Sequence, residues 1–355
     1  MKKLVIEKDA VRENLAVVRE SAESAEICAV LTGDAYGAGL VELARFLRGE
    51  GITRFAVSEP EEAEALREAG LEHEEIWMLR ATTDRGELGR LIDCGAVCTV
   101  SSVETGMALN ALAESRSTVA EAQLLVDVGM GFGGFLPEDS EKILSMYRNL
   151  PNVAITGIYT QLHSDQTDGR NAAIQMDAFQ KLLETIREAG YETGLVHAAG
   201  SFALLHYNFA KLDAVRAGSV LLGRCRRVKG DGLRQVGYGE AVLEDVRWLP
   251  KGHTVGSEKL VTLRKPTRVA VLPVGYQNGF GVSRTRTRGL WAMLKGLRRS
   301  RRVTVRIGKA SAKVIGRIGA LETLLDVTHV KCSAGDTAVF EIDPQYVRGL
   351  TREYR

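Results

Sequence analysis

The sequence predicts an α/β fold, a (β/α)8 TIM barrel over residues 8–230 followed by a C-terminal β-rich domain over residues 231–355. Over residues 1–220, eight short apolar runs rich in β-branched residues alternate with amphipathic helical patterns, which is typical of parallel βαβ units. After about residue 230, short strand-like runs follow one another between turn residues. A chain of 355 residues is long enough for two such domains.

The first part is expected to form a barrel because eight alternating strands and helices close into a ring. Two of the helical patterns begin at typical helix-start residues, Ser58-Glu59-Pro60 and Pro137-Glu138-Asp139. A doubly wound open sheet is the alternative, but no Gly-x-Gly-x-x-Gly pattern follows the first strand. The expected strands centre near Ile27, Phe55, Ile76, Val97, Leu124, Ile155, Val196 and Val215, and the helical patterns include residues 40–47, 61–68, 103–113 and 171–188.

The second part is expected to be a β domain, in which Gly, Pro, Asp and Lys separate the strands. Residues 289–298 fit a short amphipathic helix within it, and the strand-like residues 4–6 are expected to join it, so that residues 1–7 belong to this domain. The expected strands cover residues 236–239, 260–263, 268–272, 303–305, 314–315, 326–327 and 338–340.

The composition is that of an ordinary globular protein, with 45% hydrophobic and 26% charged residues. No apolar run approaches the roughly 20 residues that a membrane helix needs, so no membrane association is expected. The first residues, Met1-Lys2-Lys3, bring charge too early for a signal peptide, which predicts a cytoplasmic protein. The five cysteines are odd in number and scattered, which favours buried thiols over disulfides or a zinc site.

Charge is distributed unevenly along the chain, whose net charge is +2. Residues 284–306 carry nine basic residues and no acidic residue, so the rest of the chain is net acidic. This stretch is either a site for an anionic partner or a solvated insertion. Trp291 is its one aromatic residue, and because stacking surfaces for nucleic acid need several, nucleic acid is not the expected partner.

Ligands of a (β/α)8 barrel bind at the carboxyl ends of its strands. The expected strand ends of this sequence carry hydroxyl groups, glycines and arginines, all of which bind phosphate. Gly218 and Ser219 follow the last strand, where barrels often bind a phosphate. The strand ends are Thr32–Tyr36, Ser58, Arg80, Ser101, Asp127–Gly131, Thr160–Gln161, Ala199–Ser201 and Arg216–Ser219.

Motifs along nearly the whole chain resemble those of the alanine racemase family of fold-type III pyridoxal-phosphate enzymes. The segment Thr32-Gly33-Asp34-Ala35-Tyr36-Gly37 is similar to the family motif of Lys, a small residue, Asn or Asp, Ala, Tyr and Gly. Any one motif is weak, but their order along the chain makes the resemblance specific. The others are Asp127–Gly131, Gly157–Thr160, His197–Ser201, Val215–Gly218, Pro273–Gly279 and Asp343–Tyr346.

This resemblance implies a set of site residues. Arg216 would face the pyridine nitrogen of pyridoxal phosphate, and since an arginine stays charged, it would weaken the cofactor as an electron sink. Tyr276 would be the acid/base tyrosine and would reach into the barrel of a second subunit, which implies a homodimer with shared sites. The residues implied to form the phosphate cup are Tyr36, Ser201, Gly218, Ser219 and Tyr346.

Several positions depart from the family pattern. Thr32 stands where the family has the lysine that forms a Schiff base with pyridoxal phosphate, and a hydroxyl cannot form an imine. In the substrate pocket, Gln161 replaces a histidine, and Phe132 replaces an arginine that supports the ring and substrate. Leu125 replaces a lysine, and Ala320-Leu321 replaces Met-Asp or Met-Tyr.

These departures predict a degenerate alanine-racemase-like protein with a retained phosphate cup. It would bind pyridoxal phosphate non-covalently, or another small phosphorylated or amino-acid-like ligand, and its racemase activity would be lost or much reduced. One alternative is a racemase that uses another lysine, such as Lys309, Lys313 or Lys331, although solvent-facing positions are expected for all three. Another is a different enzyme on the same barrel, because the fold hosts many chemistries.

Three polar residues after the sixth strand, His163, Asp165 and Asp168, are either metal ligands or loop and N-cap residues. Their spacing matches no metal-binding motif, so no metal site is expected. They are also candidate partners of Tyr276 if the barrel has acquired a new activity. His197 is expected to belong to the packing of its strand.

Overall fold

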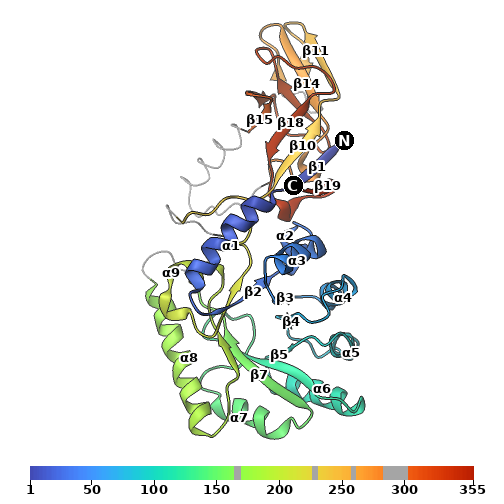
Figure 1. The fold of residues 1–355 in the computed structure, drawn as a ribbon. Helices are drawn as coiled ribbons and strands as arrows, with labels where there is room; N and C mark the ends of the chain where they lie inside the picture. Colours follow the sequence, from blue (N-terminus) through green and yellow to red (C-terminus); the bar gives the residue numbers. More distant parts are fainter. Residues whose placement is uncertain (164–168, 226–230, 257–260, 283–302) are drawn as a thin grey trace. The chain divides into compact units, whose positions relative to one another are not determined.

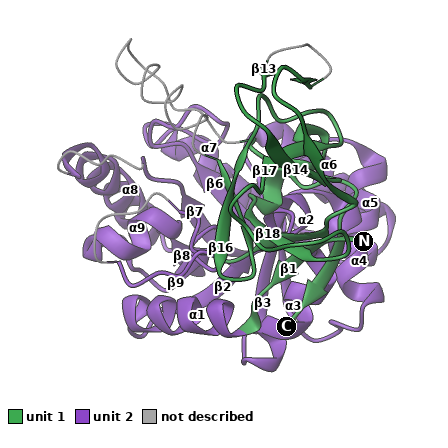
Figure 2. Ribbon diagram, turned by 90° about the horizontal axis from the view of Figure 1, so that it is seen from above, with its two compact units in different colours: residues 1–8, 236–355 green, residues 9–235 purple. Residues whose placement is uncertain are grey.

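The computed structural model describes residues 1–163, 169–225, 231–256, 261–282 and 303–355. The chain divides into two compact units (Figure 2): the first in this description is residues 9–235, drawn in purple, and the second is residues 1–8 with 236–355, drawn in green. The first unit is a parallel barrel and the second is β-rich, which confirms the predicted fold class. The helix expected at residues 289–298 and most of the basic stretch 284–306 lie outside the described residues.

Eight parallel strands form the barrel in the order β4-β3-β2-β9-β8-β7-β6-β5. Its ring closes between β4 and β5 through a parallel bridge from Trp77 to Val97, where the Val97 N–H donates to Ile76 O at 2.8 Å. Every predicted strand centre lies in or directly beside one of these strands. They are β2 (Glu26–Val30), β3 (Arg54–Val57), β4 (Glu75–Met78), β5 (Cys98–Val100), β6 (Ala120–Val126), β7 (Val153–Thr160), β8 (Leu195–His197) and β9 (Ala214–Ala217).

Helices lie on the outside of the strands (Figure 1). Amphipathic spacing puts Leu40, Leu43 and Leu47 on the buried face of one of them. Pro60, one of the predicted helix-start residues, is the first residue of α4. Ser102 forms a capping box with Thr105 at the start of α6. The helices are α1 (Lys8–Ala22), α3 (Leu40–Gly49), α4 (Pro60–Glu68), α5 (Arg85–Asp93), α6 (Val103–Ser115), α7 (Ser140–Asn149), α8 (Arg170–Glu188), α9 (Ser201–His206) and η1 (Asn208–Ala210).

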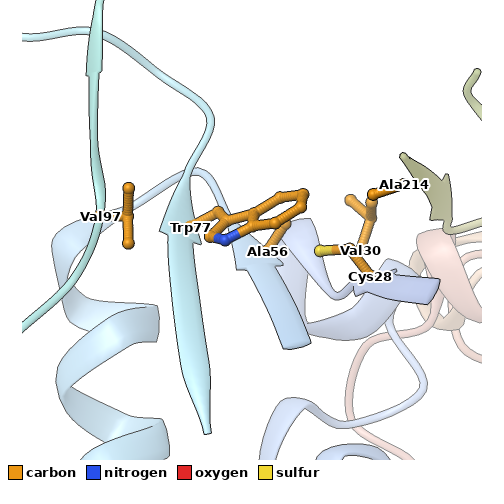
Figure 3. Close-up of a cluster of buried hydrophobic side chains, with 6 residues drawn as sticks. All are labelled: Cys28, Val30, Ala56, Trp77, Val97 and Ala214. Atoms are coloured by element: carbon orange, nitrogen blue, oxygen red, sulfur yellow. The ribbon is translucent and has the colours of Figure 1, made fainter. Parts of the chain in front are cut away.

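Apolar side chains from neighbouring strands pack together within the barrel. Figure 3 shows the Trp77 indole between Val97 on one side and Cys28 and Val30 on the other. Trp77 is 1% exposed, so the barrel is a packed core and not a pore. Of the five cysteines, which are all free, Cys94 is half-buried and the rest are buried.

The second unit is built on a nine-stranded sheet in the order β11-β14-β17-β16-β15-β18-β10-β1-β19. The N-terminal strand β1 pairs antiparallel with β10 and parallel with β19. Within the described ranges, no helix is both long and apolar enough to cross a membrane. The elements are β1 (Lys2–Ile6), β10 (Tyr238–Val242), β11 (Asp245–Leu249), β12 (Thr254–Val255), β13 (Val261–Thr262), β14 (Thr267–Leu272), η2 (Tyr276–Asn278), β15 (Thr304–Ile307), β16 (Ala310–Val314), β17 (Thr323–Asp326), β18 (Thr337–Glu341), η3 (Pro344–Tyr346) and β19 (Thr351–Tyr354).

Candidate ligand-binding site

The carboxyl ends of the eight parallel strands form one rim of the barrel, and most of the predicted site residues of the first unit lie there. Thr32 is the second residue after β2, Gln161 follows β7 directly, and Arg216 is in β9. Ser201, Gly218 and Ser219 follow β8 and β9. These residues therefore lie on one rim of the barrel, as expected from the positions at which the apolar runs of the sequence end.

The segment after β2 is a left-handed turn, α2 (Thr32–Tyr36). Gly33, Asp34, Ala35 and Tyr36 have φ angles of 65°, 56°, 53° and 54°, in the left-handed region that favours glycine. Each non-glycine residue in this region costs roughly 1–2 kcal/mol. Three such residues in a row are therefore stable only if other parts of the protein hold them.

Glu62, in the first turn of α4, holds this turn in place. One oxygen of its carboxylate accepts from the Asp34 N–H at 2.9 Å, and the other accepts from the Ser58 N–H at 3.1 Å. The carboxylate of Asp34 accepts from the Leu40 N–H at 2.8 Å, which ties the turn to the start of α3. This role of Glu62 could not be predicted from the sequence, because nothing local shows which N–H groups its carboxylate reaches.

Tyr36, Ser201 and Gly218 lie together on the rim. A Cβ atom added at Gly218 would lie 2.4 Å from the phenol oxygen of Tyr36, so only glycine leaves room for the ring. The Ser201 Oγ accepts from the N–H groups of Gly218 and Val220 at 3.0 and 3.3 Å. Burial raises the pKa of Tyr36, and a hydrogen bond with the Thr32 side chain acts in the opposite direction.

Arg216 is 4% exposed and lies at the centre of a hydrogen-bond network. Its Nη2 donates to Thr160 O and to the Gln161 Oε1, both at 2.7 Å, and its Nη1 donates to the His197 Nδ1. No carboxylate pairs with it among the residues the structure describes. Burial lowers the pKa of Arg216, but an arginine keeps its charge, so the rim holds a buried positive charge without an acidic partner.

His197 supports Arg216 from below. It is fully buried between the rings of Trp77 and Tyr159, at centroid distances of 4.6 and 4.8 Å. Because Arg216 donates to Nδ1, the ring proton is on Nε2, which lies 2.8 Å from the Gln123 Oε1. Burial, and then the charge of Arg216, lower the pKa of His197 well below 6.5. The sequence placed His197 in packing correctly but missed its bond to Arg216.

A cavity of about 200 Å³ opens beside Arg216. Tyr159, which lies 5.1 Å below the Arg216 guanidinium, contributes to its wall. The predicted pocket residues Gln161 and Phe132 both line it, and Phe132 is 85% exposed. The full lining is Leu79, Leu125, Val126, Asp127, Met130, Phe132, Gly133, Tyr159, Gln161 and Arg216.

His163 belongs to the loop structure beside this cavity. Its Nε2 forms a hydrogen bond with Gly129 O at 3.0 Å, and the Asp127 carboxylate accepts from the N–H groups of Gly129 and Gly131. Across the described ranges, no group of three or more His, Cys, Asp or Glu side chains is arranged to hold a metal ion. Asp165 and Asp168 lie outside those ranges.

Lysines of the barrel unit lie outside the barrel strands wherever the structure describes them. Lys142 in the first turn of α7 pairs with Asp139 at 3.0 Å, and Lys181 pairs with Asp177 on α8 at 2.7 Å. Lys211 pairs with Glu23 at 3.0 Å, and it precedes β9, at the end of that strand opposite to the rim. None of these three side chains is at a strand end where a ligand would bind.

The second unit brings its own predicted residues together. The Tyr276 N–H donates to Gly319 O at 2.9 Å, and the next residue donates to Ala320 O at 3.0 Å. A Cβ added at Gly279 would lie 2.5 Å from Tyr346 O. Tyr276, which is 53% exposed, is therefore a neighbour of both Ala320 and Tyr346. Lys309, Lys313 and Lys331 are all exposed.

Two family models match this sequence in succession. The model "Alanine racemase, N-terminal domain" matches residues 6–225, and "Alanine racemase, C-terminal domain" matches residues 238–346. The chain belongs to the alanine racemase family. This agrees with the resemblance seen in the motifs of the sequence.

Individual relatives support the same assignment. The alanine racemase of Carboxydothermus hydrogenoformans is 31% identical over 275 residues, which are 76% of this chain and 74% of that protein. The alanine racemase of Clostridium difficile 630 has the same fold, with a TM-score of 0.88 and 23% identity over 100% of this chain and 95% of that one. An alanine racemase from Bartonella henselae, solved with covalently bound pyridoxal phosphate, gives a TM-score of 0.82 at 21% identity over 100% and 99% of the two chains.

Proposed function

We propose that this alanine racemase family member binds pyridoxal phosphate, or another small phosphorylated or amino-acid-like ligand, without a covalent bond, and that its racemase activity is lost or much reduced. The observation that carries the proposal is the set of groups on the barrel rim. Groups that would hold a phosphate and a ring are present, whereas Thr32 occupies the lysine position. The described lysines of the barrel unit form ion pairs and do not stand at the strand ends.

The phosphate end of the ligand would be held by Tyr36, Ser201, Gly218 and Ser219. Gly218 fits this role because its missing side chain leaves the space in which the Tyr36 phenol lies. In the described part of the chain, neither the N–H nor the hydroxyl of Ser219 has a protein partner, so both are free for phosphate oxygens. Hydroxyl groups and glycine N–H groups are common phosphate ligands in barrels.

Arg216 would hold the ring end. Its buried charge lacks an acidic partner among the described residues, which favours a ligand with a hydrogen-bond acceptor at this place. Pyridoxal phosphate, when bound, supplies an electron sink through its ring, and an arginine at the ring nitrogen weakens that sink. His197 and Gln161 fix the guanidinium through hydrogen bonds, so the positive charge stays in one position.

The set of residues that could transfer protons is incomplete for racemisation. Two-base racemisation needs one acid/base group on each face of the substrate. Tyr276 would be one such group, and in a homodimer it would act with Ala320 and Tyr346 beside the barrel of the partner subunit. Thr32, at the position of the second base, has a hydroxyl that is a poor base at neutral pH. The protein would therefore bind its ligand and exchange the α-proton slowly or not at all.

The test is the intact mass of the full chain after incubation with pyridoxal phosphate and reduction with borohydride, together with calorimetric titration of the unreduced protein. We expect no stoichiometric adduct and saturable binding. A stoichiometric adduct mapped to one lysine, in the barrel or the second unit, would refute the non-covalent site and favour a working racemase with a different lysine. Absence of both adduct and binding would favour a new activity for another ligand.

A further inference from the structure

The cavity beside Arg216 has two walls of different chemistry. Tyr159, Gln161 and Arg216, from β7, its end and β9, form a polar wall. Leu125, Met130 and Phe132, from β6 and the loop that follows it, supply apolar side chains. Leu125 is the register partner of Tyr159 on the neighbouring strand, so the two walls meet there.

Two charged side chains in the cavity lining lie outside the apolar wall and form hydrogen bonds with other protein groups. They are Arg216 and Asp127. Both terminal nitrogens of Arg216 donate to protein acceptors on the polar wall, and both oxygens of Asp127 accept from N–H groups of the loop. The apolar wall therefore offers a ligand no cation. A carboxylate placed against it would lose part of its hydration without gaining a cationic partner, which disfavours it relative to an apolar group.

We propose that Leu125, Met130 and Phe132 form a subsite for an uncharged, apolar arm of the ligand, and that this subsite discriminates against an arm that ends in a carboxylate. The inference rests on the proposed function for the position of the phosphate and ring. It adds the chemical class of the arm that is attached to the ring. Phe132, which is 85% exposed, would lose this exposure against the arm, and that burial is the source of affinity.

Two stable amine adducts that differ in one group test this subsite. The first is N-(5′-phosphopyridoxyl)alanine, and the second is the adduct of 3-methylbutan-2-amine, in which an isopropyl group replaces the carboxylate. Calorimetric titration of the full chain is expected to give at least about tenfold tighter binding for the isopropyl adduct, because it buries apolar area and avoids an unpaired carboxylate. Equal binding, or tighter binding of the alanine adduct, would overturn the subsite.

Charge substitutions in the apolar wall sharpen the test. Leu125→Lys and Phe132→Arg each put a cation beside the arm and are expected to reverse the preference for the isopropyl adduct. Phe132→Arg is at an exposed position and is expected to fold even if Leu125→Lys does not. Ile174→Lys, which adds the same charge at a 64% exposed position on α8 outside the cavity, is the control and should keep the original preference. An unchanged preference in Phe132→Arg would overturn the assignment.

Failure of the subsite and failure of the proposed function give different results. If pyridoxal phosphate binds but the two adducts bind equally, the subsite is wrong and the proposed function stands. If neither pyridoxal phosphate nor the adducts bind, the proposed function is wrong, and the apolar wall is then tested with indole by saturation-transfer NMR. Indole binding that is lost in Phe132→Arg would support the subsite, and no indole binding would overturn it.

Discussion

Two sectors of the barrel rim differ in how their side chains are held. In the sector of β2 and β9, the Tyr36 ring lies against Gly218, and the Ser201 hydroxyl accepts from the Gly218 N–H. Arg216 donates to the side-chain oxygen of Gln161. In the sector of β6, Leu125 and Phe132 make the wall apolar, and Phe132 projects with 85% of its surface exposed. One sector presents charged and polar groups, whereas Leu125, Met130 and Phe132 give the other an apolar surface.

The hydrogen bonds of the polar sector do not involve the apolar wall. Arg216 on β9 bonds to groups on the adjacent strand β8 and on β7, two strands away, and Ser201 bonds to the segment after β9. Leu125 and Phe132 take no part in these bonds. We therefore expect substitutions at these two positions to leave the hydrogen bonds of the polar sector in place.

The largest effect is expected when a primary amine is placed at position 32 in the polar sector. Thr32→Lys puts a primary amine at the end of β2, beside Tyr36, and should change the borohydride-reduced adduct with pyridoxal phosphate from absent to stoichiometric. Intact mass and peptide mapping measure it. Racemase activity is expected to stay low, because Leu125, Phe132 and Gln161 still depart from the family pattern.

Thr32→Met is the matched control for this prediction, because it adds a long side chain without an amine. It should give no adduct. If Thr32→Lys also gives no adduct although the protein is folded and binds pyridoxal phosphate, then position 32 does not face the ligand. The assignment of the β2 sector to the cofactor would then be wrong.

The next largest effect is expected at Glu62, whose carboxylate holds the left-handed turn. Glu62→Gln replaces one acceptor oxygen by an amide donor, so either the Asp34 N–H or the Ser58 N–H loses its partner. An unsatisfied buried group costs about 1–3 kcal/mol, and we expect the free energy of unfolding in urea to fall by this amount. Since the turn carries Tyr36, affinity for pyridoxal phosphate should fall as well.

Glu61→Gln provides the control, since Glu61 is the preceding residue of α4 and its exposed carboxylate pairs with Arg90 on the protein surface. It should change unfolding and binding little, because exposed ion pairs contribute little. Equal losses of stability and affinity in the two variants would mean that general destabilisation of the helix, and not loss of the Glu62 hydrogen bonds, is responsible.

These residues also show what the sequence could and could not predict. Apolar periodicity located the eight strands and, through their ends, Thr32, Gln161, Ser201 and Arg216. It did not predict the left-handed conformation of Asp34-Ala35-Tyr36, because that conformation depends on a carboxylate 28 residues away. Local pattern likewise missed β11, an edge strand in which none of the five residues is buried and Trp248 is 59% exposed.

A smaller effect is expected from filling the space at Gly218. The added Cβ of Gly218→Ala would lie 2.4 Å from the Tyr36 phenol oxygen, so the ring must move away from the phosphate position. We expect affinity for pyridoxal phosphate to fall about tenfold, which corresponds to about 1.4 kcal/mol. Gly49→Ala, at the end of α3 with no atom within 4 Å of the new Cβ, should leave affinity unchanged. Unchanged affinity in Gly218→Ala would remove Tyr36 from the site.

The last effect is a pH dependence of stability that arises beneath the polar sector. His197 has its pKa held well below 6.5 by burial and by Arg216, whereas the unfolded chain protonates this histidine near pH 6.5. The unfolded state therefore binds a proton that the native state excludes. The contribution of neutral His197 to stability is complete above about pH 6.5 and is lost as the pH falls, by up to about 1.4 kcal/mol per pH unit.

This contribution is measured by urea unfolding of the wild type and of His197→Gln between about pH 7.5 and pH 5. The interval runs from about one pH unit above to about 1.5 units below the pKa of histidine in the unfolded chain. The glutamine can accept from Arg216 and donate to Gln123 but does not titrate, so the stability of the variant should fall less steeply with pH. His206 also has a lowered pKa, through burial, and adds its own slope to both proteins, so the difference between them isolates His197. Parallel stability curves would mean that His197 is already charged in the native protein, and then Arg216 could not donate to its Nδ1 and would no longer be fixed by the barrel interior.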